Sequence, residues 1–192
     1  MDFLKKIFSS KSKDYKHLQE QAEDNKTASM EDDERFVYHF IQKGGKFFYP
    51  DDMDDFKREL INLLKYLKAD SYAVIERSYF HFLEKLGVPV KYSFTETDVL
   101  LGGCESLIAD EGAIMTTATH TKEYRNIELP HKRVIVGLSN QIVSNKSQAL
   151  IAINKRYETP PANIQTMSVF SKPQNDLSGG KWYETYLFLI EN

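Results

Sequence analysis

Stretches with the spacing of an amphipathic helix alternate along the chain with short runs of apolar and β-branched residues. The predicted helices lie around residues 35–43, 51–67, 80–86 and 145–153, and the predicted strands at 46–49, 71–75, 99–101, 113–117, 133–138, 164–170 and 182–190. Helices and strands that alternate in this way predict an α/β protein with a mostly parallel sheet and helices on both of its faces.

Two stretches sharpen this prediction. The run RVIVGL at 133–138 has β-branched residues without polar alternation, which is typical of a strand covered on both faces. The helix at 51–67 opens with four aspartates among residues 51–55. A calcium loop needs a different order of acids and a glycine, whereas acids stabilise a helix N-terminus by capping, so capping is the predicted role.

The segment TDVLLGGCESLIADEGAIMTT, residues 97–117, places glycines and reactive side chains between two predicted strands. Its notable positions are Gly102, Gly103, Cys104, Glu105, Asp110, Glu111 and Gly112. Ligands of open α/β sheets bind in the crevice outside the carboxyl ends of the strands, so this junction is the first place to expect a site. The glycines lack the fixed spacing of a dinucleotide fingerprint or a P-loop. Their alternative role is to end strands.

Asp110 and Glu111 are the candidate catalytic acids. A carboxylate beside Gly112 can act as a base or a nucleophile, or hold a ligand hydroxyl. Adjacent residues of an extended segment point to opposite sides, so only one of the two would enter a given cleft. Structural pairing of Glu111 is the alternative.

A polar, cationic stretch follows the motif and includes Thr116, His120 and Arg125. The guanidinium of Arg125 can bind a carboxylate or a phosphate through two parallel hydrogen bonds, which suits a small anionic metabolite. An ion pair with Glu123 or Glu128 is the alternative for Arg125. His120 lies beside the motif and would face the cleft.

Composition narrows the classes of function. A net charge of −3 and a pI near 6.0 argue against a general nucleic-acid binder. The one cysteine, Cys104, excludes an intramolecular disulfide and an iron–sulfur cluster within this chain, since a cluster needs about four cysteines. With no histidine in its motif, Cys104 is predicted to be a buried residue rather than a nucleophile. The five histidines lack the helical spacing of a zinc site, so no metal is expected.

The first 33 residues differ in charge pattern from the rest. Lysines dominate up to residue 16 and acids dominate residues 20–34, with a short amphipathic turn at 3–8. We expect an N-terminal arm at 1–33 that docks on a partner, a membrane surface or the protein itself, followed by a single domain at 34–192. No apolar run is long enough to span a membrane, and MDFLKKIF lacks the apolar core of a secretory signal, so a cytoplasmic location is expected.

The motif IADEGAIM at 108–115 resembles the isoleucine–alanine–acid–Thr/Ser–Gly–Thr–apolar motif of the lactate-utilisation (LUD) domain family, the LutC/YkgG-type proteins. The order of Arg125, Ile127, Leu129-Pro130, the strand at 133–138 and Gln141-Ile142-Val143 is also similar to that of the family. The resemblance is clearest over 98–150. The family's late Ser-x-Thr-Ala-Asp-Ile segment reads FSKPQNDLSGGK here, with Ser171, Lys172 and Asp176 as remnants.

The resemblance implies a three-layer fold like that of CoA-transferases and ribose-5-phosphate isomerases. Together with the residues singled out above, it predicts catalysis by Glu111 and Asp110, and substrate binding by Gly102, Gly103, Gly112, Thr116, His120, Arg125 and Lys172. The implied function is that of a LutC-like component of an L-lactate utilisation system, which oxidises lactate to pyruvate. Its role beside iron–sulfur partner subunits would be accessory, substrate-handling or regulatory.

Two alternatives remain. One is a stand-alone transferase or ligase that acts on an acyl or phosphorylated small molecule through Glu111 and Arg125. The other is a ligand-binding or scaffold module without chemistry. Whether the chain is an enzyme and whether it forms a homo-oligomer stay open.

Overall fold

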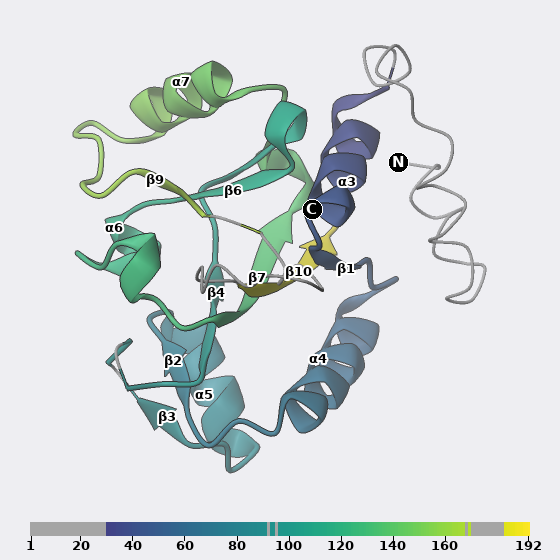
Figure 1. Ribbon diagram of the computed structural model, residues 1–192, viewed down its shortest axis with the longest axis vertical. Helices are drawn as coiled ribbons and strands as arrows, with labels where there is room; N and C mark the ends of the chain where they lie inside the picture. Colours follow the sequence, from purple (N-terminus) through teal and green to yellow (C-terminus); the bar gives the residue numbers. More distant parts are fainter. Residues whose placement is uncertain (1–29, 92, 95, 168, 170–182) are drawn as a thin grey trace, which may run out of the picture.

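The computed structural model describes residues 30–91, 93–94, 96–167, 169 and 183–192. Within these ranges the chain forms a six-stranded sheet, sheet A, and a four-stranded sheet, sheet B, with helices packed around them (Figure 1). Residues 1–29 of the predicted arm lie outside the described residues, as does Lys172.

Sheet A is parallel throughout. In spatial order its strands are β1 (Lys46–Phe48), β10 (Glu184–Ile190), β7 (Lys132–Leu138), β4 (Val99–Gly103), β2 (Tyr72–Val74) and β3 (Val90–Lys91). The two central strands β7 and β10 match along their whole length, from Lys132 opposite Glu184 to Leu138 opposite Ile190. Both faces of β7 are covered, which accounts for the lack of polar alternation in its sequence.

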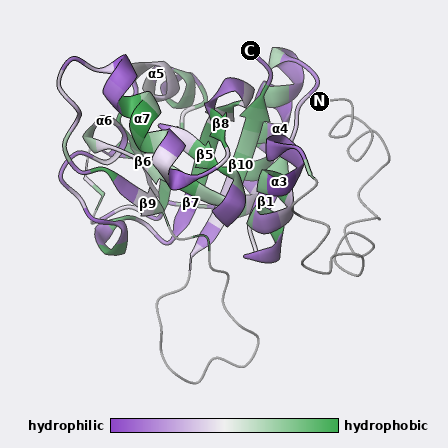
Figure 2. Ribbon diagram, turned by 90° about the horizontal axis from the view of Figure 1, so that it is seen from above, coloured by the Kyte–Doolittle hydropathy of each residue, from purple (hydrophilic) through white to green (hydrophobic). Residues whose placement is uncertain are grey.

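Helices cover both faces of sheet A. On one face, α4 (Met53–Leu67) and α5 (Arg77–Lys85) share a core with β7 that includes Leu60, Val134 and Val136. On the other face, α3 (Asp32–Gln42) and sheet B share a second core with Ile135. Figure 2 shows the apolar strands in the middle and the polar positions on the helices and loops around them. The predicted three-layer α/β fold with a mostly parallel sheet is confirmed.

Sheet B was not predicted. Its order is β8 (Ile142–Val143), β5 (Ser106–Ile108), β6 (Ala113–Thr116) and β9 (Gln165–Met167), with β6 antiparallel to both β5 and β9. The strands β6 and β9 were predicted, at 113–117 and 164–170, but not their pairing into a second sheet. β5 and β8 were missed, because three and two residues carry too little pattern to be recognised in the sequence. The outer face of sheet B is covered by α7 (Lys146–Arg156) through Ala149 and Ile153. Leu150 of the same helix is exposed.

Side chains at the helix starts act as the sequence predicts. The Asp52 carboxylate accepts hydrogen bonds from the backbone N–H groups of Asp54 and Asp55 at 2.9 and 2.8 Å, so the capping role of the aspartates is confirmed. Asn145 caps α7 by accepting from the N–H of Gln148 at 3.0 Å.

The turn between β5 and β6 departs from the prediction. Asp110 and Glu111 do not lie on an extended segment, because they form a 3-10 turn, η2 (Ala109–Glu111), that reverses the chain between antiparallel strands. Gly112 follows with a φ of +51°, in the left-handed region that glycine adopts most easily. A Cβ at Gly112 would lie 2.2 Å from the backbone nitrogen of Phe40 in α3. Gly112 therefore lets the turn pack directly on that helix.

Gly112→Ala should lower the free energy of unfolding by about 2–4 kcal/mol, because it combines left-handed strain with a clash against backbone. Gly87→Ala is a matched control: its φ is +67° but nothing lies within 4 Å of the added Cβ, so only the strain of about 1 kcal/mol applies. Urea denaturation of both variants measures the difference. Equal destabilisation of the two would contradict the packing role of Gly112.

Candidate functional site

Polar groups meet at the carboxyl ends of β2 and β4. Glu76 follows β2 by two residues, and its Oε1 accepts a hydrogen bond from the backbone N–H of Gly103, the last residue of β4, at 2.7 Å. A Cβ at Gly103 would lie 3.1 Å from the same oxygen. The absence of a side chain at Gly103 thus lets the carboxylate approach the strand. Gly102, where a Cβ would lie 3.6 Å from this oxygen, is less constrained.

His120 enters the same neighbourhood from α6 (Ala118–Thr121), a short helix capped by Thr117. Its Nδ1 lies 3.4 Å from the backbone nitrogen of Thr117 and 3.0 Å from the Thr119 hydroxyl. A backbone N–H can only donate, so Nδ1 accepts and the neutral ring carries its proton on Nε2. Thr117 and Thr119 therefore hold the Nδ1 edge of the ring and fix its orientation.

Three charged side chains influence the protonation of His120. Burial lowers the pKa of His120, the carboxylates of Glu76 and Glu105 favour its protonated form, and the guanidinium of Arg156 opposes it. The same three charged groups act on Cys104. Glu76, Cys104, Glu105, His120 and Arg156 therefore form one electrostatic group, which we call the carboxyl-end cluster.

Within this cluster, Glu105 and Arg156 form an ion pair that has a structural role. The Glu105 side chain is only 2% exposed and is paired with Arg156 and with the hydroxyl of Tyr157, the latter at 3.1 Å. A buried carboxylate needs such partners because burial removes its hydration. The Arg156 side chain is 47% exposed, so part of its guanidinium faces solvent next to the cluster. It is a cation that a small carboxylate can reach.

Cys104 is buried, as predicted, and its Sγ lies 3.6 Å from Oε1 of Gln141. The same amide accepts from the N–H of Leu138 and donates to the carbonyl of Cys104, both at 2.7 Å, so Gln141 ties the end of β7 to the end of β4. Burial raises the pKa of the Cys104 thiol, and Glu105 and Glu76 raise it further. This environment disfavours the thiolate that a nucleophile requires.

The predicted catalytic acids lie on the turn η2 against α3. Asp110 pairs with Nε of Arg35 in α3 at 2.9 Å, and its side chain is 51% exposed. Glu111 is exposed, and its backbone carbonyl accepts a hydrogen bond from Nζ of Lys43. Among the described residues, no hydrogen bond or ion pair joins Asp110 or Glu111 to the carboxyl-end cluster.

The other predicted binding residues are dispersed. Arg125 is exposed and paired with Glu128, its Nε lying 3.2 Å from Oε2, which is one of the alternatives that the sequence left open. Thr116 is buried in sheet B, and its hydroxyl has no hydrogen-bond partner in the described part of the chain. The structure thus groups Gly102, Gly103 and His120 and leaves Gly112, Thr116 and Arg125 apart from them.

Sequence reasoning missed Glu76 and Arg156. Glu76 directly follows the predicted strand at 71–75, so an acid at the carboxyl end of a parallel strand was an available signal. Arg156 gives no such signal, because its approach to Glu105 depends on how α7 packs on sheet B. Across the described residues, no three histidine, cysteine or acidic side chains are grouped so as to hold a metal ion. No helix in those ranges is both long and apolar enough to cross a bilayer.

The fold and the cluster define an α/β protein with a polar group at the carboxyl edge of a parallel sheet. No family model and no curated protein matches the chain. Among solved structures, the chain is similar to a DUF162 family protein from Deinococcus radiodurans, with a TM-score of 0.61 and 14% sequence identity over 85% of this chain and 99% of that one. DUF162 corresponds to the LUD domain. At this identity the likeness shows a common fold, and chemistry has to be argued from the site.

His120 should titrate below the usual histidine range when its imidazole resonances are followed by NMR, because burial disfavours the charged ring. Glu76→Gln should lower the pKa of His120 further, since it removes a charge that stabilises the imidazolium. Glu111→Gln removes an acid outside the cluster and should leave the titration unchanged. A rise in the His120 pKa in Glu76→Gln would contradict the cluster.

Cys104 should react with iodoacetamide much more slowly in the native protein than in the unfolded chain, because burial hides the thiol and raises its pKa. Alkylation followed by mass spectrometry at pH 8, with and without guanidinium, measures the ratio. We expect a slowing of about a hundredfold or more, since each unit of pKa removes about ninety per cent of the thiolate. Labelling of the native protein at the rate of a free cysteine would contradict the burial argument.

Proposed function

We propose that this chain is a LUD-type protein that binds a small carboxylate-bearing metabolite at the carboxyl-end cluster and handles substrate in an L-lactate utilisation system. The observation that carries the proposal is the pairing of Glu76 with the N–H of Gly103 beside the oriented imidazole of His120. A carboxylate at this edge, where α/β sheets hold their ligands, and an imidazole whose pKa it influences support acid–base chemistry here.

The chemistry of a hydroxy acid suits these groups. Its carboxylate requires a cation, and the partly exposed guanidinium of Arg156 supplies one. Its hydroxyl requires an acceptor for a proton, which the carboxylate of Glu76 supplies, whereas the Nε2–H of His120 can donate to a ligand oxygen. Oxidation of lactate to pyruvate releases two protons and two electrons; in this proposal Glu76 takes up the hydroxyl proton, solvent takes up the other proton, and iron–sulfur partner proteins take up the two electrons.

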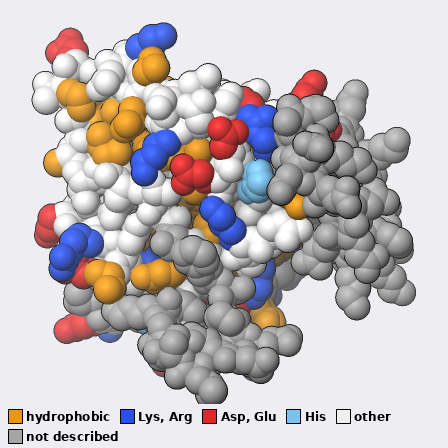
Figure 3. All heavy atoms as spheres, turned by 45° about the horizontal axis from the view of Figure 1, so that its top comes forward, with side chains coloured by type: hydrophobic (Ala, Val, Ile, Leu, Met, Phe, Trp, Pro, Cys, Tyr) orange, Lys and Arg blue, Asp and Glu red, His pale blue; other side chains and the backbone are white. Residues whose placement is uncertain are grey.

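The surface charge also supports a small ligand over a nucleic acid. On the face drawn in Figure 3, acidic and basic side chains are interleaved rather than gathered into one basic patch. A phosphate backbone is bound by such a patch. The fold likeness to a DUF162 protein is consistent with a LUD-type role.

A thermal-shift screen with lactate, pyruvate, CoA esters and sugar phosphates should find stabilisation by a hydroxy or keto acid, since a ligand at a hundred times its Kd adds about 2.7 kcal/mol. Glu76→Gln and His120→Gln should weaken that ligand about tenfold to a hundredfold, the usual effect of losing a charge-assisted contact. The amide that Glu76→Gln introduces can still accept from the N–H of Gly103, so the fold should persist.

Glu111→Gln and Arg125→Gln are the matched controls, and binding should survive both. Loss of binding in these two variants alone would move the site to the acids and the arginine that the family motif implies. Affinity purification of the protein from native cells tests its proposed association with iron–sulfur partners. An eluate without cysteine-rich iron–sulfur proteins would count against the role in lactate utilisation.

A further inference from the structure

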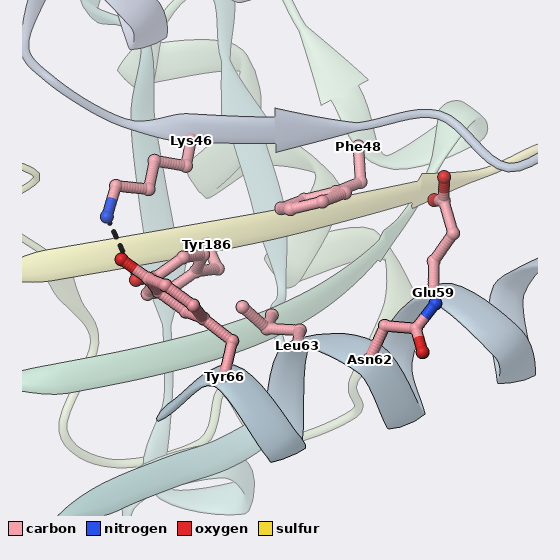
Figure 4. A pocket seen from close by; sticks show the side chains of 7 residues that line it. All are labelled: Lys46, Phe48, Glu59, Asn62, Leu63, Tyr66 and Tyr186. Carbon is pink, nitrogen blue, oxygen red and sulfur yellow. Dashed lines mark hydrogen bonds between the residues drawn. The ribbon is translucent and has the colours of Figure 1, made fainter. Parts of the chain in front are cut away.

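A cavity lies at the β1 edge of sheet A. It has a volume of about 420 Å³ and opens between the edge strand β1 and the helix α4. Its lining residues are Lys46, Phe48, Glu59, Asn62, Leu63, Tyr66 and Tyr186 (Figure 4). This volume lies within the range of small-molecule sites. Strands β10 and β7 separate the cavity from the carboxyl ends of β4 and β2, so it is distinct from the carboxyl-end cluster.

The walls of the cavity are aromatic and firmly held on one side. Phe48 extends from β1 toward Leu63 and Tyr66 of α4 (Figure 4). Its ring stacks on Phe188 of the core, with centroids 4.6 Å apart and planes 18° apart. Tyr66, by contrast, is 70% exposed. The cavity therefore combines one fixed aromatic wall with one that can adjust to a ligand.

Glu59 provides an unsatisfied acceptor in this cavity. Its Oε2 is buried and has no hydrogen-bond partner among the described residues. Burial raises the pKa of Glu59; Asp55 and Asp51 raise it further, and Arg58 opposes them. Glu59 lines the cavity, and no described residue pairs with its carboxylate, so a ligand that carries a donor would compensate this acid.

The cation already in the cavity does not serve this purpose. Nζ of Lys46 is paired with Glu184, donates to the hydroxyl of Tyr186 at 2.9 Å and lies 4.4 Å from the centre of the Tyr186 ring. Figure 4 shows Lys46 and Glu59 toward opposite ends of the cavity. The charge of Lys46 is therefore compensated at its own end, and the Glu59 end remains acidic.

We propose that this cavity binds a small organic amine, with an ammonium group donating to Glu59 and a planar apolar body between Phe48 and Tyr66. An ammonium supplies the missing donor and neutralises the acidic end. The faces of aromatic rings also attract cations and pack well against flat apolar groups. A carboxylate or phosphate at this end is disfavoured, because the carboxylate of Glu59 would repel it.

Benzylamine is the test probe, with benzyl alcohol and benzoate as neutral and anionic counterparts of the same shape. NMR titration of the full chain should show benzylamine shifting the amide signals of α4 and β1, with benzyl alcohol weaker by about tenfold and benzoate without effect. Equal binding of benzylamine and benzyl alcohol, or no binding of benzylamine, would overturn the proposal.

Two variants locate the site. Glu59→Gln keeps the size of the side chain and removes its charge, and it should weaken benzylamine about tenfold or more. Tyr66→Ala alters an exposed side chain, so the protein should stay folded and bind benzylamine several-fold more weakly. Glu84→Gln, an exposed acid on α5, is the control and should change nothing. Unchanged affinity in both Glu59→Gln and Tyr66→Ala would place the amine elsewhere and refute the site; if Glu59→Gln does not fold, unchanged affinity in Tyr66→Ala alone refutes it.

Discussion

Coverage of sheet A on both faces is the constraint on which the rest of this structure depends. Val134 and Val136 of β7 face the helices α4 and α5, and Ile135 between them faces α3 and sheet B. An interior of this kind has no room for unpaired charge, because a buried ion without partners is too costly. Polar chemistry is therefore confined to the strand ends and the sheet edges, which is where both the carboxyl-end cluster and the α4 cavity lie.

Sheet B shapes the carboxyl-end cluster as well as the fold. Gln141 joins the ends of β7 and β4, and the pair between Glu105 and Arg156 fastens the last turn of α7 to the start of β5. Removing one member of a buried pair leaves the other charge uncompensated, so α7 cannot shift without cost. Since Glu105 and Arg156 also act on His120 with opposite sign, the packing of α7 sets part of the electrostatics of the site.

The sequence predicted the helices and strands better than it predicted the tertiary contacts between them. The apolar stripe of α4 and the unbroken run of β7 were recognisable because each repeats one pattern over many residues. The approach of Glu76 to Gly103 depends instead on β2 pairing with β4, where Val74 lies opposite Leu101. Strand order is a property of the packed chain, so no local pattern reveals it. Gly112 was predicted to belong to a ligand site but packs on α3, because this contact too depends on the packed chain and not on a local pattern.

The two proposed sites differ in charge and share one rigid sheet. The carboxyl-end cluster offers the exposed part of Arg156 to an acid, whereas the α4 cavity offers the unsatisfied Glu59 to an amine. β7 and β10 lie between them and are hydrogen-bonded over seven residue pairs, from Lys132 and Glu184 to Leu138 and Ile190. Binding at one site could affect the other only if strands β7 and β10 moved together. Neither proposed ligand requires such a movement to make its contacts. Because coupling between two sites requires states that each ligand distinguishes, an acid and an amine should bind here without affecting one another.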